Sequence, residues 1–288
     1  MTFTMLILVS TFGFAAEPQT QQDDAEAEKA RIKKWGEFYA SEAAQYEFLL
    51  DNDSEHKLKL ESPSVLQYTN PERAADQHGA IYVWTWDGRP EVIGSIWSSL
   101  PRDNVEQRTI SHEFQSLSLR PVVSKHAPRV GRNGTVPDWS PRAAGIELHV
   151  IADAPAPAAQ PVARLAQMRR LVAEFSAKIT LSDVEAHGNL RLLTQPLTRY
   201  SSKSAGVSDG ALFAYVQATD PELILLVEAR ETSDGPRWHF AAARFTNRPL
   251  QLMHQDREVW SCSKAPAFVG DQTYFLYWGV STRSRSLD

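Results

Sequence analysis

The hydrophobic pattern of the chain is a helix-like stripe followed by several strand-like segments, and this order occurs twice. Apolar residues recur every three or four positions over residues 25–45 and again over residues 162–177, which predicts an amphipathic helix in each half. After each helix come short apolar runs or alternating segments, which are typical of β-strands. Because no helical pattern interrupts either series, each half is expected to form an antiparallel sheet with its helix on one face.

The turn residues refine this prediction. Asp51-Asn52-Asp53-Ser54 lies between two strand-like segments and predicts a hairpin, and Asp87-Gly88 is a strong hairpin-turn dipeptide. The expected strands of the first half are residues 46–50, 57–61, 80–86, 91–98, 112–119 and 146–151. Those of the second half are residues 190–193, 211–218, 223–228, 238–244, 250–253 and 273–280.

The two halves also resemble each other residue by residue. Residues 79–84 read GAIYVW and residues 210–215 read GALFAY, and Pro-Glu plus two aliphatic residues follow each run at the same spacing. Leu-Lys-Leu at 58–60 matches Leu-Arg-Leu at 190–192 with almost the same shift. We therefore expect an α+β fold of two related helix-plus-antiparallel-sheet units in tandem, paired about a pseudo-twofold axis. The alternative is coincidence between two β-rich segments.

The N-terminus predicts export. Residues 5–16 form an apolar run too short to span a bilayer, and a polar segment follows, although no Lys or Arg precedes the run. The expected organisation is a signal peptide over 1–16, a first unit over 17–153, an Ala/Pro linker over 154–161 and a second unit over 162–288. We expect a secreted or periplasmic protein with no membrane span after signal cleavage.

Composition narrows the chemistry. The formal net charge is −5 in 288 residues, which argues against a nucleic-acid partner. The single cysteine, Cys262, excludes an intramolecular disulfide and is interpreted as structural. None of the eight histidines stands in a metal-binding pattern, and no nucleotide-binding or hydrolase motif occurs. We therefore expect neither a metal nor a cofactor.

Four side chains are the candidates for a ligand site between the halves: Trp86, Arg89, His112 and Arg244. Trp86 matches Gln217 in the second half whereas Trp84 matches Tyr215, so Trp84 is expected in the core and Trp86 nearer the surface.

Three titratable or charged positions, His112, Arg120 and Arg248, also have a purely structural interpretation. His112 is expected either to pair with a carboxylate across the sheet or to be an ordinary hydrogen-bonded strand histidine. Arg120 and Arg248 each precede a proline, and each is either an anion contact or one half of an ion pair with Glu91 or Glu222.

Three runs carry a resemblance to a group of proteins: residues 79–91 (GAIYVWTWDGRPE), 112–117 (HEFQSL) and 209–222 (DGALFAYVQATDPE). With these runs the chain resembles uncharacterised secreted proteins of planctomycete bacteria over nearly its whole mature length. The resemblance implies export and a bacterial origin, and it carries over no catalytic residue.

Two hypotheses about function follow. The first is a non-catalytic binding or interaction protein whose partner is an unknown small molecule, glycan or protein. The alternative is a hydrolase or isomerase whose acid–base residues come from His112, Glu113, Glu222 or His239. The sequence alone does not separate them.

Overall fold

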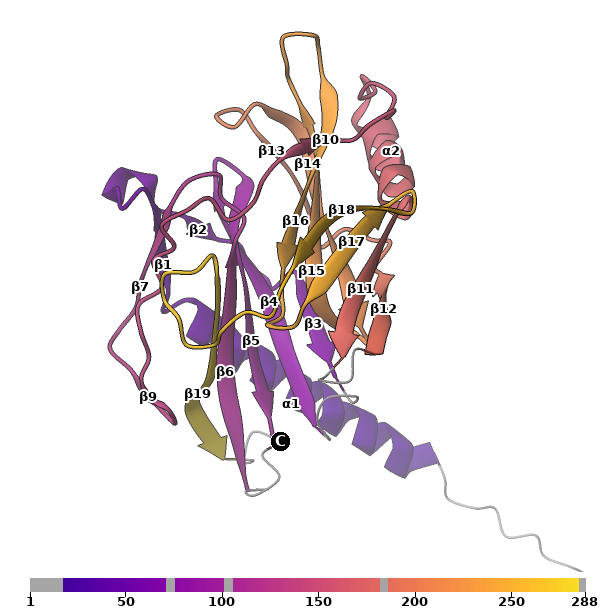
Figure 1. Cartoon of the computed structure of the whole chain (residues 1–288). Helices are drawn as coiled ribbons and strands as arrows, with labels where there is room; N and C mark the ends of the chain where they lie inside the picture. The colour runs from indigo at the N-terminus through magenta and orange to yellow at the C-terminus, as the bar shows by residue number, and fades with distance from the viewer. Residues whose placement is uncertain (1–17, 71–75, 101–105, 182–185, 285–288) are drawn as a thin grey trace, which may run out of the picture.

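The computed structural model describes residues 18–70, 76–100, 106–181 and 186–284, so the signal peptide expected over 1–16 lies outside the described residues. Helix α1 spans Pro18–Ala43 and α2 spans Pro161–Ala173, and every strand pairing between named strands is antiparallel. The expected α+β class with mostly antiparallel sheet is confirmed (Figure 1).

The first large sheet has six strands. Its hydrogen-bonded order is β19-β6-β5-β4-β2, and β3 also pairs with β4. These strands are β2 (Lys59–Leu60), β3 (Leu66–Thr69), β4 (Gln77–Trp86), β5 (Arg89–Ser99), β6 (Gln107–Ser116) and β19 (Tyr274–Ser284).

The second large sheet has nine strands in the order β10-β16-β15-β14-β12-β11-β17-β18, and β13 also pairs with β14. These strands are β10 (His149–Val150), β11 (Phe175–Leu181), β12 (Ala186–Leu192), β13 (Thr198–Ser202), β14 (Val207–Gln217), β15 (Asp220–Arg230), β16 (Arg237–Arg244), β17 (Leu250–His254) and β18 (Arg257–Cys262).

One expected hairpin forms only in part. Strand β1 (Glu47–Leu50) pairs in register with β7 (Val122–Lys125). To the segment after the turn it is joined by the antiparallel bridge between Leu49 and Lys57, where the Leu58 amide donates to the Phe48 carbonyl at 2.8 Å. A short 3-10 helix (Ser54–His56) occupies the expected turn, and β2 pairs with β4 instead. The remaining strands β8 (Val130–Gly131) and β9 (Gly134–Thr135) form a small ribbon.

The second helix is shorter than its apolar stripe predicts. It ends at Ala173, and Phe175, which fits the helical spacing, begins β11. Buried Phe175, Ala177 and Ile179 alternate there with exposed Ser176 and Lys178. This period of two places one face of β11 in the core, and tertiary pairing with β17 overrides the helical pattern.

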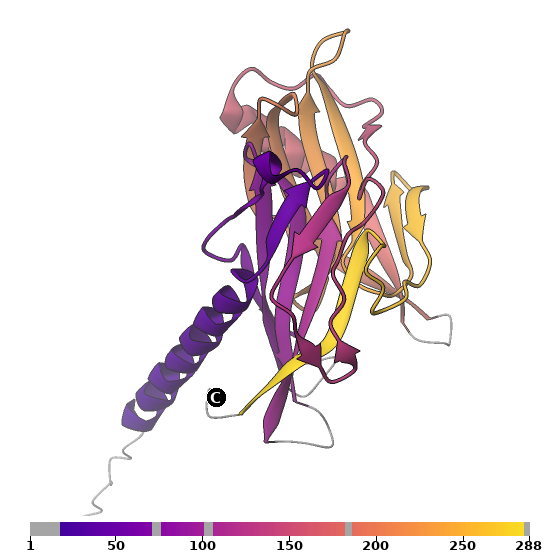
Figure 2. The ribbon, with the colours of Figure 1, turned by 90° about the vertical axis from the view of Figure 1, so that its left-hand side faces the viewer.

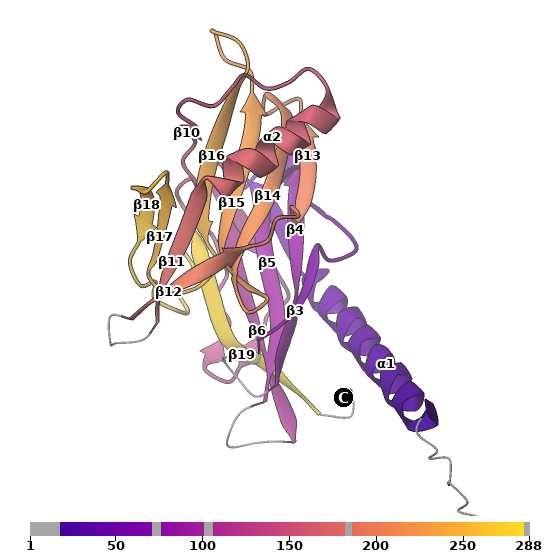
Figure 3. The ribbon, with the colours of Figure 1, turned by 90° about the vertical axis from the view of Figure 1, so that its right-hand side faces the viewer.

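Each large sheet has buried side chains on both of its faces. Figure 2 shows α1 beside the first sheet, and Figure 3 shows α2 lying across the second. On β4, Tyr82 and Trp84 point to the outer face and share a core with α1, while on β14 Phe213 and Tyr215 share a core with α2. The residues between them point inward. A third core joins the inner faces of the two sheets and includes Ile81, Val83, Ile93, Leu212, Ala214, Ile224 and Leu226.

The last strands of the two halves cross between the sheets. Strand β19, from the C-terminal end of the chain, pairs with β6 and so belongs to the first sheet. Strand β10, which precedes α2, pairs with β16 of the second sheet. The expected boundary at residues 154–161 therefore divides the sequence but does not divide the two sheets. Residues 152–160 form neither helix nor strand.

Candidate functional site

The β4–β5 hairpin places Arg89 between the two sheets. Asp87 and Gly88 have φ values of 46° and 81°, so both turn positions adopt the left-handed conformation of a two-residue hairpin turn. A Cβ on Gly88 would lie 2.7 Å from the Ser201 carbonyl oxygen, because the turn packs tightly on the second sheet. The expected Asp87-Gly88 turn is confirmed.

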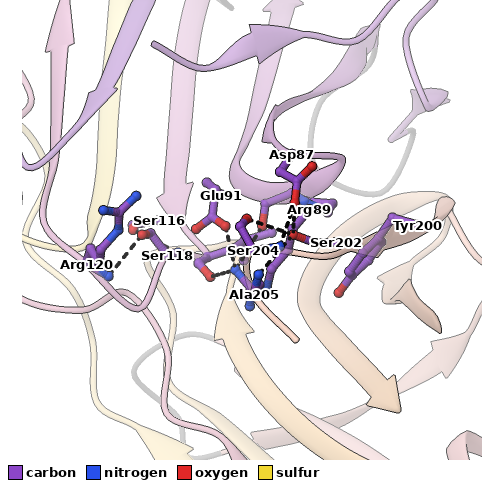
Figure 4. A network of polar contacts seen from close by, with 12 residues as sticks. Asp87, Arg89, Glu91, Ser116, Ser118, Arg120, Tyr200, Ser202, Ser204 and Ala205 are labelled. Carbon is purple, nitrogen blue, oxygen red and sulfur yellow. Dashed lines mark hydrogen bonds and ion pairs between the residues drawn. The ribbon is translucent and has the colours of Figure 1, made fainter. Parts of the chain in front are cut away.

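Asp87 fastens this turn to the loop after β13. Its Oδ2 accepts hydrogen bonds from the Ser204 backbone amide at 2.7 Å and from the Ser202 hydroxyl at 3.1 Å (Figure 4). These bonds lower the pKa of Asp87, so the carboxylate stays ionised in this role. The turn therefore holds the start of β5 at a fixed place on the second sheet.

Arg89 is 1% exposed and bonds to carboxylates from both sheets. Its Nε donates to Glu228 Oε1 at 2.8 Å, and its Nη1 donates to Glu91 Oε1 and to the Leu117 carbonyl at 3.1 Å each. Burial alone would lower the pKa of Arg89, but the charges of Glu228 and Glu91 outweigh burial and raise it. The guanidinium is therefore a permanent buried cation.

Glu228 is the other centre of this network. It is fully buried, and besides the Arg89 bond it accepts the Tyr200 hydroxyl at 2.8 Å and Arg230 Nη1 at 2.6 Å. Burial raises the pKa of Tyr200 well above its usual value, and the nearby Glu228 charge adds to the effect, so this hydroxyl remains a donor. Burial also raises the pKa of Glu91, and Arg89 only partly offsets this.

One donor of this network is unused. Arg89 Nη2 is buried and has no hydrogen-bond partner among the described residues. A cavity of about 470 Å³ lies beside it, between the sheets. Its lining residues are His56, Trp86, Arg89, Glu91, Ser118, Leu119, Arg120, Ser204, Ala205 and Arg230.

Two of the four expected site residues meet at this cavity. Trp86 is half-buried and stands edge-on to His56 with ring centroids 5.0 Å apart, whereas Trp84 is fully buried, as expected. Arg120, at the rim, forms an ion pair with Asp51 at 2.8 Å. The partner of Arg120 is therefore Asp51, in the turn after β1, and neither of the expected residues Glu91 and Glu222.

His112 lies elsewhere, in the core between α1 and the first sheet. It is fully buried, its Nδ1 is 2.6 Å from the Tyr46 hydroxyl, and its Nε2 is 3.3 Å from Glu42 Oε2. The carboxylate partner therefore comes from α1 and not from across the sheet. Burial lowers the pKa of His112, which favours the neutral imidazole. Among the described residues, His112 lines neither the Arg89 cavity nor the cavity that contains Arg244.

Arg244 lies apart from both Arg89 and His112. It lines a separate cavity of about 550 Å³ together with Trp260 and Cys262. Its guanidinium donates to three backbone carbonyls, those of Thr246, Arg248 and Ser263, at 2.8–2.9 Å. Arg244 thus stabilises the turn between β16 and β17. Burial raises the pKa of Cys262, which disfavours a reactive thiolate and agrees with a structural role.

The residues that the second half contributes to the Arg89 network, Tyr200, Glu228 and Arg230, were not among the expected site residues. Glu228 is a carboxylate inside the otherwise apolar run of β15, and this was the available signal, because a buried charge requires a partner. Tyr200 and Arg230 carry no such local signal. They join the network only because β13 and β15 lie opposite the β4–β5 turn.

The structure also bears on metal binding and on membrane-spanning helices. Among the described residues, no group of three or more His, Cys, Asp or Glu side chains is arranged to hold a metal ion. Within the same ranges, no helix has the length and apolarity needed to cross a bilayer. No known protein-family model matches the chain, and neither a curated protein nor a solved structure is significantly similar to it.

Proposed function

We propose that this protein is a non-catalytic binding protein, and that its cavity beside Arg89 takes a small ligand carrying an anionic group. The observation that carries the proposal is the buried Nη2 of Arg89, a charged donor without a partner next to a cavity. Leaving a buried charged donor unpaired is costly, so such a group favours a ligand that completes its hydrogen bonds.

The lining supports a ligand with a carboxylate on a ring or an apolar body. Arginines 89, 120 and 230 contribute three cationic side chains to the wall, against one carboxylate, Glu91. Trp86 and the partly exposed Leu119 offer apolar contact beside them. Acidic sugars combine these features, since a sugar ring stacks on an indole while a guanidinium binds its carboxylate.

The calorimetric test uses glucuronate as the probe, inorganic phosphate as a plain anion and glucose as the neutral analogue. We expect glucuronate to bind more tightly than glucose. Arg89→Lys keeps the charge but loses the planar fork, and Trp86→Ala removes the indole. Each should weaken glucuronate binding by at least about tenfold, or 1.4 kcal/mol.

Trp278→Ala is the matched control, because Trp278 is a partly exposed tryptophan that does not line this cavity. Its affinity for glucuronate should equal that of the wild type. Equal binding of glucose and glucuronate, no binding of either anion at millimolar concentration, or unchanged affinity in Arg89→Lys and Trp86→Ala would each overturn the proposal.

We also propose that the fold arose by tandem duplication, with the two units paired about a pseudo-twofold axis. Strand registers support this proposal. Leu66 pairs with Ile81 and Thr198 pairs with Leu212, so matching positions of the repeat have matching partners. Register shifts in the two hairpins also fall at equivalent places, after Trp84 in β4 and after Tyr215 in β14.

The crossing strands add to this support. Ile96 pairs with His112, and Val227, 131 positions later, pairs with Phe240, so His112 and Phe240 are equivalent. On their other edges His112 pairs with Tyr277 of β19, and Phe240 pairs with His149 of β10. Each sheet thus receives an edge strand from the end of the other half. Such reciprocal exchange is what duplication of a strand-swapping unit would produce.

Export remains a proposal that rests on the apolar segment 5–16 and the polar residues after it. We propose that the mature protein begins near residue 17 and acts in the periplasm or outside the cell. Expression of the full chain in a bacterium, fractionation and N-terminal sequencing test this. A cytoplasmic protein that retains Met1 would contradict it.

The enzyme alternative stays a prediction without a specific observation in its favour. Its four expected acid–base residues are spread over the molecule. His112 lies under α1, Glu113 and Glu222 lie near Tyr274, and His239 lies on β16 beside the edge strand β10.

A further inference from the structure

The outer edge of β16 is only partly covered. Strand β15 pairs with the whole length of β16, whereas β10 pairs with just two of its residues, His149 with Phe240 and Val150 with His239. Among the described residues, no strand pairs with residues 241–244 on the side away from β15. The second half of β16 is therefore an open sheet edge.

The register of β16 shows which of its backbone groups point to this open edge. The Phe245 amide donates to the Glu222 carbonyl at 2.7 Å, just after the last pair of the two strands. Hydrogen-bonded and non-bonded residues alternate along an antiparallel pair. Ala243 therefore bonds to β15, while Ala242 and Arg244 direct their backbone N–H and C=O groups away from it.

The same alternation is visible where β10 covers the edge. The Ile151 amide donates to the Trp238 carbonyl at 2.9 Å, so the even-numbered residues of β16 are the ones that face outward. Ala242 continues this row and is only 4% exposed. Within the described parts of the chain, its backbone N–H and C=O have no hydrogen-bond partner. Buried backbone groups are nearly always paired, so this position favours an added partner.

Gly145 explains why the chain before β10 leaves this edge. Its amide donates to the Ser118 carbonyl at 2.7 Å, and its carbonyl accepts from Gln115 Nε2 at 3.3 Å. A Cβ on Gly145 would lie 2.1 Å from the Ser116 carbonyl oxygen, so the close approach requires glycine. The segment 143–147 thus follows the first sheet, and the cavity that contains Arg244 lies between this segment and β16.

Gln115 places a second unused group in the same cavity. It is 1% exposed, and its Nε2 donates to the Ser116 carbonyl at 2.7 Å as well as to Gly145. Both amide hydrogens are therefore engaged, which fixes Oε1 as an acceptor. This Oε1 is buried and has no hydrogen-bond partner among the residues that the structure describes. A buried acceptor without a donor favours a ligand that supplies an N–H or O–H group.

The rest of the wall suits an uncharged ligand. Ile146, Ala243 and Trp260 contribute apolar surface beside the open edge. The Arg244 guanidinium already donates to three backbone carbonyls, and Glu147 is an exposed residue at the rim. The specific contacts that the cavity offers are therefore the backbone groups of β16 and the Gln115 carbonyl oxygen.

We propose that this cavity binds a short extended peptide segment, which continues the position of β10 by pairing with Ala242 and Arg244 and donates an amide to Gln115 Oε1. An extended peptide presents N–H and C=O groups on both of its edges, so it can satisfy β16 on one side and Gln115 on the other. The proposal is independent of the anion site, because this cavity and the Arg89 cavity share no lining residue.

The probe is the peptide acetyl-Ala-Val-Ala-Thr-amide, whose small and β-branched residues favour an extended chain beside the alanines of β16. Its analogue with every backbone amide N-methylated keeps the apolar surface but has no main-chain N–H donor. In calorimetry, the unmodified peptide should bind at least about tenfold more tightly than the methylated one. In NMR hydrogen exchange, it should slow exchange of the Ala242 amide, while the Ala243 amide, already bonded to β15, stays unchanged.

Two variants test the site itself. Ala242→Pro removes only the outward N–H, which proline tolerates on an edge strand, and should weaken peptide binding at least about tenfold. Ala144→Trp places a bulky group at an exposed lining residue, so it tests the cavity even if Ala242→Pro folds poorly, and it should weaken binding several-fold. Ala127→Trp is the matched control at an exposed alanine outside this cavity and should bind like the wild type.

Four results would overturn the proposal: equal affinity of the two peptides, no binding of the unmodified peptide at millimolar concentration, no slowing of Ala242 exchange at saturation, or unchanged affinity in both cavity variants. Glucuronate binding is measured on the same samples. Failure of the peptide site is thereby distinguished from failure of the anion site.

Discussion

At the scale of single residues, the buried pair of Arg89 and Glu228 determines how the two sheets fit together. Both side chains are almost completely shielded from water. Arg89 comes from the first sheet and Glu228 from the second. Removing one partner of a buried ion pair leaves the other charge without compensation, which costs much more than the net stability that the intact pair contributes.

We therefore expect Glu228→Gln to lower the free energy of unfolding by about 3–5 kcal/mol, since Arg89 and Arg230 both lose their carboxylate. Urea unfolding of the full chain measures this. The control is Glu258→Gln, an exposed carboxylate bonded only to surface side chains, which should change stability by less than about 0.5 kcal/mol. Equal effects of the two substitutions would contradict the assigned role of Glu228.

The contribution of Glu42 to the free energy of unfolding depends on pH in the acid range. Burial alone would raise its pKa, but the nearby His112 imidazole and the charge of Arg129 outweigh burial and lower the pKa from 4.5 to about 2. Because the folded-state pKa is the lower one, the carboxylate stabilises the fold above pH 4.5 and loses this effect as the pH falls towards 2.

This shift corresponds to roughly 3 kcal/mol at neutral pH, and Glu42→Gln should remove it. The variant should be less stable than the wild type at pH 6 and nearly equal to it at pH 2. Urea titrations across this range measure the difference, with Glu37→Gln on the exposed face of α1 as the control. A constant gap between Glu42→Gln and wild type at all pH values would rule out this origin.

The sequence predicted some residues of the site and missed others for a physical reason. Trp86 and Arg89 could be predicted from the sequence because they flank a recognisable turn. Glu228 and Tyr200 reach Arg89 only across the interface between sheets, and no local pattern encodes that contact. His112 was also misplaced, because its partner Glu42 lies on a helix 70 positions earlier in the chain.

At the scale of elements, most strands can be predicted from alternating apolar residues and from turn residues. The pairing of one strand with another cannot. The expected hairpin after β1 is reduced to a single bridge, because a short 3-10 helix follows the turn residues and the next strand, β2, pairs with β4. The stripe of α2 ran on into β11 because Phe175 fits both periods. Local patterns define such elements, but competition among pairings decides where each one ends.

The C-terminal strand provides a test at this scale. Deleting residues 273–288 removes β19, including Phe275 and Tyr277 of the first core, and exposes the edge of β6. Each lost side chain is worth about 1.5–3 kcal/mol of burial, so the first sheet should lose several kcal/mol of local stability. Hydrogen exchange should show faster exchange in β5 and β6, with β14 and β15 retaining their protection.

The matched control is deletion of residues 285–288 alone, which leaves β19 in place. If the C-terminal strand belonged to the second unit, as the linear boundary predicts, protection would instead be lost in β14 and β15. That pattern would contradict the crossing of β19 between the sheets.

At the scale of the whole molecule, the two sheets enclose an apolar core. This core joins Ile81, Val83 and Ile93 of one sheet to Leu212 and Leu226 of the other. The Arg89 cavity lies at the start of β5. The repeat in the sequence predicted two related units, while the strand exchange became visible only in the assembled fold.

Arginine side-chain NMR can show whether the cavity beside Arg89 binds an anionic ligand through the guanidinium, as we propose. Glucuronate is titrated into full-length protein labelled with nitrogen-15 on arginine. The Arg89 guanidinium resonances should shift with saturation, while those of Arg108, another fully buried arginine outside this cavity, stay constant. If the Arg89 signals remain unchanged at saturating glucuronate, or if Arg108 shifts equally, the account of this site is wrong.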